Sequence, residues 1–246
     1  MFNASNDYKD QIVSFIDILG FSNTINRIED DNELHERIHW ALTYIYSYKR
    51  SSKTQNTVQS NLNVSVFSDS IVFTGNLDDY HAILWSSACL HTNLLGYGIL
   101  TRGGISTGSI FHSDDILYGK GLIKAHEIES KVAVYPRIVL DPSFSQSLPK
   151  EYRNILLSVD TDGLYYIDPF CLDAAIGDAD SQLADGYDPH EIFLVELGNK
   201  IEVEINNSIN IKDKAKWNWL STRHEIAKKE YLKTHETRWS LLLKKT

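Results

Sequence analysis

Two aspartates stand inside apolar, strand-forming stretches, where a carboxylate needs a reason to be present. Asp17 lies in SFIDILGFS, just before a Gly-Phe-Ser turn, and Asp69 lies in NVSVFSDSIVFTG, between runs of Val, Ile and Phe. A buried and unpaired carboxylate costs several kcal/mol. Hard oxygen ligands of this kind suit Mg²⁺ or Mn²⁺. If the two strands end near the same sheet edge, the two side chains predict a two-carboxylate metal site.

The turn that follows Asp17 adds a second element of chemistry. Gly20, Phe21 and Ser22 open a helical stretch, and backbone N–H groups at the start of a helix bind phosphate oxygens with help from the helix dipole. Two metal ions beside such a turn can activate an attacking hydroxyl and stabilise a leaving phosphate. These residues predict a nucleoside-triphosphate site. A simpler interpretation stays open, in which both aspartates are ordinary capping or turn residues.

Hydrophobic periodicity places the elements that position these residues. Residues 11–19 form a nearly continuous apolar run, typical of a central strand that is covered on both faces. An i, i+4, i+8 stripe predicts a helix over about 32–50, and two β-rich runs predict a tight hairpin with Asp69 at its tip. Further patterns predict helices over 78–98 and 118–130, and strands over 100–111 and 132–140. Glycines in the strand over 100–111 indicate that another backbone or a ligand comes close.

The order of these elements predicts an α/β (α+β) fold, in which helices flank a central, mostly antiparallel sheet. We expect residues 1–141 to form the catalytic core. Residues 142–246 would complete the same domain and add a C-terminal helical extension, a long helix or helix pair anchored by Trp217, Trp219 and Leu220.

Composition limits the class of protein. The chain has 246 residues, 42% of them hydrophobic and 23% charged, as in ordinary globular proteins. It has no apolar run long enough to span a membrane and no visible signal peptide. Its 2 cysteines suit a reducing compartment. These features predict a cytoplasmic protein. The net charge of −9 argues against non-specific binding to nucleic acid or to an anionic membrane.

Four short motifs also occur in the order that is found in the class III nucleotidyl cyclases. FIDILGFS resembles the F-x-D-I-x-G-F signature of that family, and VFSDSIVF stands where the family has its G-D hairpin. TRGGISTG resembles the R-x-G-I-x-x-G strand, and YGKGLIKAHEIES resembles the Y/W-G-x-x-V-N-x-A-x-R-x-E helix. The resemblance covers about residues 12–130. It implies a class III cyclase-like fold and a homodimer whose sites are built between two subunits.

The positions at which the chain departs from these motifs indicate which group of cyclases it resembles most. Ser65 stands where purine-specific members have a base-reading Lys, and Ile116 stands at the offset of its partner Asp, with Asp115 available only if one residue is inserted. Ile123 and Glu127 replace the transition-state Asn and Arg. Together with YPRIVL and a long Trp-containing C-terminal segment, this combination resembles the pyrimidine cyclases of the Pycsar anti-phage defence systems.

The resemblance implies an enzyme that converts UTP to 3′,5′-cyclic UMP and pyrophosphate with two divalent ions, Mn²⁺ or Mg²⁺. The product would activate a separately encoded, cell-killing effector. A cytidylate cyclase and a purine cyclase are the alternatives within this chemistry. A cyclase-like module that binds nucleotide without turnover is the alternative outside it. The missing Asn/Arg pair favours that module, and the two retained aspartates argue against it.

The resemblance also implies roles for single residues. Asp17 and Asp69 would ligate both ions, with the backbone carbonyl of Ile18 completing one coordination sphere. The expected nucleotide contacts are Phe15, Gly20, Phe21, Ser22 and Ser65. The expected replacements for the missing positive charge are Arg102, Lys124 and Arg137, with Lys120 on the same helix face as Lys124. Either lysine is otherwise an ordinary solvated residue, and Arg102 otherwise orients strands or closes a dimer contact. Arg137, within an apolar strand, needs a partner, and triphosphate is one option.

Overall fold

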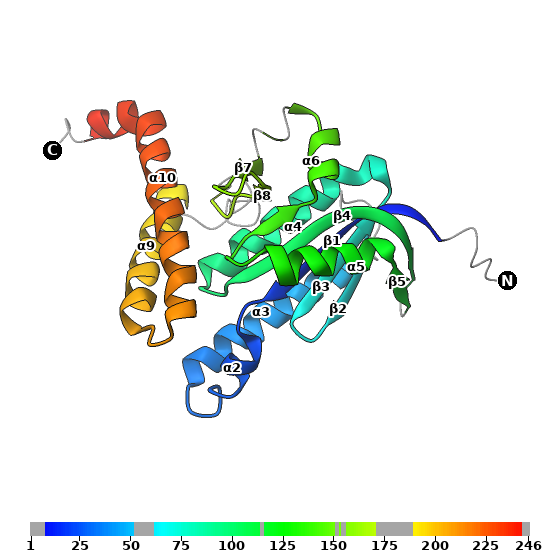
Figure 1. The fold of residues 1–246 in the computed structure, drawn as a ribbon. Coiled ribbons are helices and arrows are strands. Elements are labelled where there is room, and N and C mark those ends of the chain that lie inside the picture. Colours follow the sequence, from blue (N-terminus) through cyan, green and yellow to red (C-terminus); the bar gives the residue numbers. More distant parts are fainter. Residues whose placement is uncertain are drawn as a thin grey trace. The chain divides into compact units, whose positions relative to one another are not determined.

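The computed structural model describes residues 8–51, 62–113, 116–150, 153, 156–170 and 189–242. The chain divides into two compact units, Met1–Gly177 and Asp178–Thr246. The first unit contains everything that precedes the C-terminal helices, including strands beyond residue 141 (Figure 1). The division at residue 141 that the sequence suggests stays a prediction.

One mixed sheet forms the centre of the first unit. It has eight strands in the order β2-β3-β1-β4-β6-β8-β7, with β5 paired to β4. Only the β4–β6 pair is parallel among the pairs described. The predicted α/β class with a mostly antiparallel sheet is therefore confirmed. The strands are β1 (Lys9–Ile18), β2 (Asn63–Phe67), β3 (Ser70–Gly75), β4 (Thr101–His112), β5 (Leu117–Gly119), β6 (Ile138–Leu140), β7 (Leu157–Val159) and β8 (Tyr165–Ile167).

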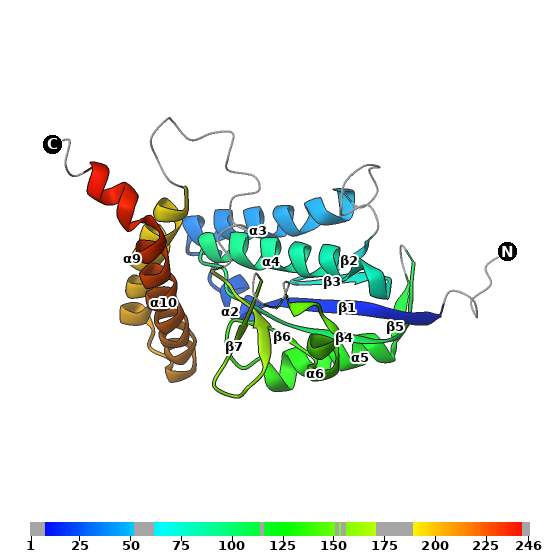
Figure 2. The same ribbon diagram turned by 90° about the horizontal axis from the view of Figure 1, so that it is seen from above.

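Helices cover both faces of this sheet. In Figure 2, α3 and α4 lie along one face and α5 lies on the opposite face. The helices of this unit are α2 (Phe21–Ile25), α3 (Asn32–Ser51), α4 (Tyr80–Gly96), α5 (Lys120–Glu127) and α6 (Pro142–Ser147). A 3₁₀ turn (Leu77–Asp79) precedes α4, and a π-helical turn (Ile128–Val132) continues α5. The predicted helix over about 32–50 and the hairpin with Asp69 at its tip are confirmed.

β1 lies between β3 and β4, so its side chains alternate between two covered faces. Ile12, Ile16 and Ile18 belong to the large core beneath α3 and α4. Val13 and Phe15 belong to a smaller cluster with Ala125 of α5. Because successive side chains point to opposite faces of a sheet, Asp17 shares the α5 face with Phe15. This double coverage explains why the strand is apolar almost throughout.

The glycines of β4 let α5 pack directly on the sheet, as their positions predicted. A Cβ atom on Gly104 would lie 2.2 Å from the carbonyl oxygen of Ala125. A Cβ atom on Gly108 would lie 3.0 Å from the Cα atom of Gly121. Ser106 between them donates its hydroxyl to the carbonyl of Gly121 (2.8 Å). The close approach brings the end of α5 over the carboxyl end of β1.

The predicted strand over 132–140 is wrong in extent, because only Ile138–Leu140 pair in the sheet. The π-helical turn occupies the first position of the predicted strand, since it runs to Val132 and is closed by a hydrogen bond from Ala133 N–H to Ile128 O (2.8 Å). Pro136 also lacks an N–H to give to a ladder. Arg137 consequently precedes β6 rather than lying within a strand.

The second unit is a helix pair, as one of the two sequence alternatives expected. α9 (Pro189–Asn207) and α10 (Ile211–Leu242) meet where His224 packs on Gly198 and bonds to the carbonyl of Leu194 (2.8 Å). Trp217 and Leu220 are buried and Trp219 is half-buried. Among the helices that the structure describes, none combines the length and hydropathy needed to cross a membrane.

We expect a buried histidine to make the first unit sensitive to acid. Burial lowers the pKa of His91 to about 4, whereas the pKa in an unfolded chain is about 6.5. The unfolded chain therefore binds the extra proton first, and the free energy of unfolding should fall as the pH drops from 6.5 towards 4, by ~3 kcal/mol at most. Urea denaturation at several pH values measures this slope.

His91→Gln should flatten the slope, and His35→Gln, at an exposed position of α3, should leave it unchanged. Equal slopes in the wild type and His91→Gln would contradict the assignment.

Candidate active site

Asp17 lies at the carboxyl end of β1, between a hydroxyl and a guanidinium on the neighbouring strands. Its cross-strand partners are Ser70 on β3 and Arg102 on β4. The Ser70 hydroxyl donates to Asp17 Oδ1 at 2.7 Å. Directly opposed residues of antiparallel strands point to the same face, so the three side chains form one row on the α5 side of the sheet.

Asp69 reaches the same edge from the hairpin tip. Ser68, just before it, has a positive φ of 53°, which closes the turn tightly. The Ile18 N–H donates to the Asp69 carbonyl at 3.2 Å, and this bond ties the end of β1 to the turn. The two aspartates are close enough to repel each other. The structure thus places Asp17, Ile18 and Asp69 together.

The environment of Asp17 disfavours its charge in the absence of a cation. Burial is the largest cause that raises the pKa of this carboxyl above its usual value, and repulsion from Asp69 adds to it. The Ser70 hydrogen bond and the positive charges of Arg102 and His126 act in the opposite direction. A bound divalent ion would remove the cost of ionisation, since an opposite charge favours the ionised form.

The chain turns sharply directly after this edge. Gly20 has φ 75° and ψ 17°, a left-handed conformation that favours glycine, and a Cβ atom there would meet no atom within 4 Å. α2 begins at Phe21, and Thr24 bonds back to the carbonyl of Gly20 through its N–H and its hydroxyl. Phe21 packs on the large core, whereas Ser22 is exposed. The predicted turn residues Gly20, Phe21 and Ser22 therefore lie directly after the end of β1, where Asp17 stands.

Arg102 is held by a carboxylate that the sequence analysis did not single out. Its Nε atom lies 2.5 Å from Oε1 of Glu129, and Glu129 is only 3% exposed. Burial is the largest cause that raises the pKa of Glu129, the charge of Arg102 lowers it, and the charge of Asp17 raises it again. The sequence signal for Glu129 was its match to the final E of the Y/W-G-x-x-V-N-x-A-x-R-x-E helix motif, to which no role had been given. The site therefore contains an ion pair between the half-buried Arg102 and the buried Glu129, next to Asp17.

Phe15 contacts a histidine of α5. The Phe15 and His126 rings meet edge to face with centroids 5.2 Å apart, and His126 Nε2 lies 3.9 Å from Glu129. Phe15 is thus partly covered by a residue of the same chain. Its predicted contact with a base stays a prediction.

Lys124 is directed to a different carboxylate. Its Nζ atom lies 2.9 Å from Asp141, the N-cap of α6. Burial alone would raise the pKa of Asp141, but hydrogen bonds from Ser143 and Lys124 lower it. Lys120 is exposed at the start of α5. Within this chain Lys124 pairs with Asp141 rather than with the Asp17–Asp69 edge, and its catalytic role stays a prediction.

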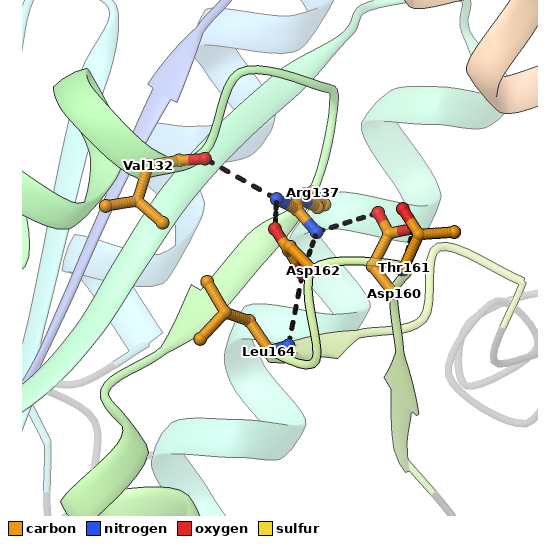
Figure 3. Close-up of polar contacts among 6 residues, drawn as sticks. All are labelled: Val132, Arg137, Asp160, Thr161, Asp162 and Leu164. Atoms are coloured by element: carbon orange, nitrogen blue, oxygen red, sulfur yellow. Dashed lines mark hydrogen bonds and ion pairs between the residues drawn. The ribbon is translucent and has the colours of Figure 1, made fainter.

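Arg137 has carboxylate partners rather than an open position (Figure 3). Its side chain is 3% exposed, and its terminal nitrogens contact Asp160 at 2.7 Å and Asp162 at 2.5 Å. Nη2 also donates to the carbonyl of Val132 at 3.5 Å. The hydrogen bond from Arg137 is the main reason why the pKa of Asp162 is lowered. The sequence predicted that Arg137 needs a partner, and it has two, Asp160 and Asp162. These carboxylates occupy the position in which the sequence analysis considered a triphosphate.

Ser65 is buried and bonded to a histidine. His112 lies between two hydroxyls, with Nε2 2.7 Å from Ser65 Oγ and Nδ1 2.7 Å from Thr74 Oγ1. Ser65 on β2 is the cross-strand partner of Val72 on β3, which in turn is the partner of Phe15 on β1. The three side chains therefore point to the same face of the sheet. Ile116, at the offset of the family's partner Asp, is 55% exposed, and Asp115 lies outside the described residues.

The oxygen atoms at the Asp17–Asp69 edge suit hard divalent cations that take their remaining ligands from a substrate. Among the described residues, no group of three or more His, Cys, Asp or Glu side chains could hold a metal ion by itself. Mg²⁺ is commonly bound through one or two carboxylates plus substrate phosphates, with water in the remaining positions. Asp17, Asp69 and the Ile18 carbonyl provide oxygen ligands of that kind at one edge.

A separate groove lies within the second unit, between α9 and α10. It has a volume of about 500 Å³ and is lined by residues such as Leu194, Gly198, Ile201, His224 and Tyr231. None of the residues predicted for the nucleotide site lines it.

Comparison with known proteins gives only distant likenesses. No family model and no curated protein matches the sequence. A structure of a bacterial light-regulated adenylyl cyclase matches with 13% identity and a TM-score of 0.45, over 65% of this chain and 90% of that one. A second such structure matches with 12% identity and a TM-score of 0.43, over 76% and 56%.

The catalytic core of a rhodopsin-guanylyl cyclase with converted specificity, in complex with ATPαS, matches with 13% identity and a TM-score of 0.43, over 65% of this chain and 95% of that one. These likenesses are weak, and they leave the activity of this chain open.

Asp17→Asn should stabilise the metal-free protein, because it removes a charge that the fold disfavours while keeping an oxygen for the Ser70 hydroxyl. We expect the melting temperature without added metal to rise by a few degrees. Mn²⁺ should raise the melting temperature of the wild type and not that of the variant. An equal Mn²⁺-induced rise in both proteins would contradict the metal assignment.

Arg137→Met should destabilise the first unit by ~3 kcal/mol, because it removes the guanidinium from a buried ion pair with Asp160. Lys131→Met, which removes an exposed pair with Glu127 (2.8 Å), should leave the free energy of unfolding close to that of the wild type. Urea denaturation of both variants measures the difference. Equal losses would show that the Arg137 cluster behaves like a surface ion pair.

Proposed function

We propose that the chain is a nucleotidyl cyclase that acts on a pyrimidine nucleoside triphosphate, with UTP as the substrate and 3′,5′-cyclic UMP and pyrophosphate as products. The observation that carries the proposal is the meeting of Asp17 and Asp69 at one sheet edge, directly before the Gly20 turn. Four cyclase-like motifs supply these residues in the expected order.

The reaction needs positioning and charge stabilisation more than covalent chemistry from the protein. The 3′-oxygen forms a bond to the α-phosphorus, the bond from that phosphorus to the oxygen that bridges to the β-phosphate breaks, and the 3′-hydroxyl proton passes to solvent water. Divalent ions held by Asp17, Asp69 and the Ile18 carbonyl would favour the deprotonated 3′-oxygen and neutralise the leaving pyrophosphate.

The chain's own groups have separate tasks in this proposal. The N–H groups around Gly20, Phe21 and Ser22 would bind the β- and γ-phosphates, since the first N–H groups of a helix have no partner within it. Arg102 is the guanidinium beside Asp17 and would supply the positive charge that the missing Asn/Arg pair leaves out.

The pyrimidine preference rests on the residues that depart from the purine-reading pattern. Ser65 in place of Lys offers a small neutral hydroxyl, bonded to His112, rather than a cation. By the same resemblance we propose a cytoplasmic homodimer, a product that activates a separate cell-killing effector, and a role in anti-phage defence. A cytidylate or purine cyclase and a non-catalytic nucleotide-binding module are the alternatives.

The decisive experiment incubates the purified protein with UTP, CTP, ATP and GTP together, in the presence of Mn²⁺, and identifies the product by mass spectrometry. We expect cyclic UMP and pyrophosphate in equal amounts. Asp17→Asn and Asp69→Asn should each lower the rate by about 10³-fold or more, since metal stabilisation is worth several kcal/mol.

Asp10→Asn is a matched control on the same strand, because Asp10 is exposed and bonds only to the Ser109 hydroxyl (2.7 Å) among the described residues. A cyclic purine nucleotide as the main product would refute the pyrimidine preference. Binding of triphosphate without release of pyrophosphate would favour the non-catalytic module.

A further inference from the structure

We propose that Glu129 is a positioning residue that holds the Arg102 guanidinium beside, but not on, the Asp17–Asp69 edge, so that the carboxylates stay available to cations and the guanidinium stays available to phosphate. This inference rests on the proposed nucleotidyl cyclase function. It gives a role to a buried carboxylate that stands at the last position of the fourth motif and that has no part in the metal assignment.

The first step is the burial of Glu129. A carboxylate that is 3% exposed needs a cationic partner, because acidic residues are almost never fully buried alone. Within the described part of the chain, the ion pairs of Glu129 are with Arg102 at 2.5 Å and with His126, itself 58% exposed, at 3.9 Å. Arg102 is therefore its principal partner.

The second step is the way in which the backbone brings Glu129 there. Glu129 lies in the π-helical turn Ile128–Val132, a rare conformation that is frequent at functional sites. Gly104 of β4 makes the approach possible, since a Cβ atom there would lie 2.7 Å from Ile128 Cβ and 3.0 Å from the N atom of Glu129. Arg102 is two residues from Gly104 on the same face, directly below the turn.

The third step is the support at the far end of the turn. The Val132 carbonyl accepts a hydrogen bond from Arg137 (3.5 Å), and Asp160 and Asp162 fix that arginine (Figure 3). The turn is thus anchored on one side by Gly104 packing and on the other by a buried ion cluster. Arg137 acts on the site through this segment rather than through a phosphate.

The fourth step is electrostatic. Asp17 is the cross-strand partner of Arg102, and Arg102 is among the charges that act on Asp17. Among the described residues, the terminal nitrogens of Arg102 have no hydrogen-bond partner, and the side chain is 27% exposed. Without Glu129, the carboxylate directly across the strand pair from Arg102 is that of Asp17. An arginine on Asp17 would compete with a divalent cation for the same oxygens.

The test is Glu129→Gln, which keeps the shape of the side chain and removes its charge. We expect Mn²⁺ binding to the nucleotide-free full chain, measured by isothermal titration calorimetry, to weaken about tenfold, since a neighbouring arginine favours the ionised carboxylate by a comparable factor. In turnover assays, the Mn²⁺ concentration for half-maximal rate should rise by the same factor.

Glu127→Gln is the matched control. It makes the same chemical change two residues away, where the carboxylate is 52% exposed and pairs with Lys131, and it should bind Mn²⁺ like the wild type. Arg102→Met/Glu129→Met removes both charges together. It should restore Mn²⁺ binding to at least the wild-type level but bind a non-hydrolysable uridine triphosphate analogue about tenfold more weakly, because the phosphate-facing cation is gone.

Wild-type Mn²⁺ binding by a folded Glu129→Gln protein would overturn the proposal. If Glu129→Gln does not fold, the double variant decides, and triphosphate binding equal to that of the wild type would overturn the proposal in the same way. The Mn²⁺ titrations do not depend on turnover. A wild type that cyclises no triphosphate would therefore refute the proposed function while the titrations still test the role of Glu129.

Discussion

The candidate site is organised around one carboxylate, Asp17, at the end of a strand that is otherwise buried on both faces. The strand is apolar because helices cover both sides, and the same coverage raises the pKa of the carboxyl and makes its charge costly. Ser70 and Arg102, its neighbours across the sheet, offset part of that cost. The remainder is a preference for a further positive charge, which is the physical basis of the proposed cation site.

The other features of the first unit place groups around that carboxylate. The tight turn at Ser68 brings Asp69 to it, and the left-handed Gly20 turns the chain so that α2 starts next to it. The glycines of β4 allow α5 and its π-helical turn to reach the same end of the sheet. The Arg137 cluster fixes the far end of that turn. Backbone geometry, more than any single strong contact, therefore assembles the site.

Much of this arrangement could be predicted from sequence because it is local. The continuous apolar run of β1, the hairpin around Asp69 and the helical stripe of α3 follow from patterns a few residues long. The partners of Arg137 could not be predicted, since Asp160 and Asp162 lie in a turn more than twenty residues later in the chain. The role of Glu129 was missed although it matches the last residue of the fourth motif, because an acidic residue near the end of an amphipathic helix resembles a solvated one. The π-helical turn that buries it has no simple sequence signature, and it also removed the start of the predicted strand over 132–140.

The central claim is that Asp17 and Asp69 jointly bind divalent cations beneath a triphosphate. A crystal structure with Mn²⁺ and a non-hydrolysable uridine triphosphate analogue tests it most directly, since the anomalous signal locates each ion. The account predicts manganese with oxygens of both carboxylates at about 2.0–2.3 Å and with phosphate oxygens opposite them. Manganese bound to phosphate alone, or at a position that neither aspartate contacts, would contradict it.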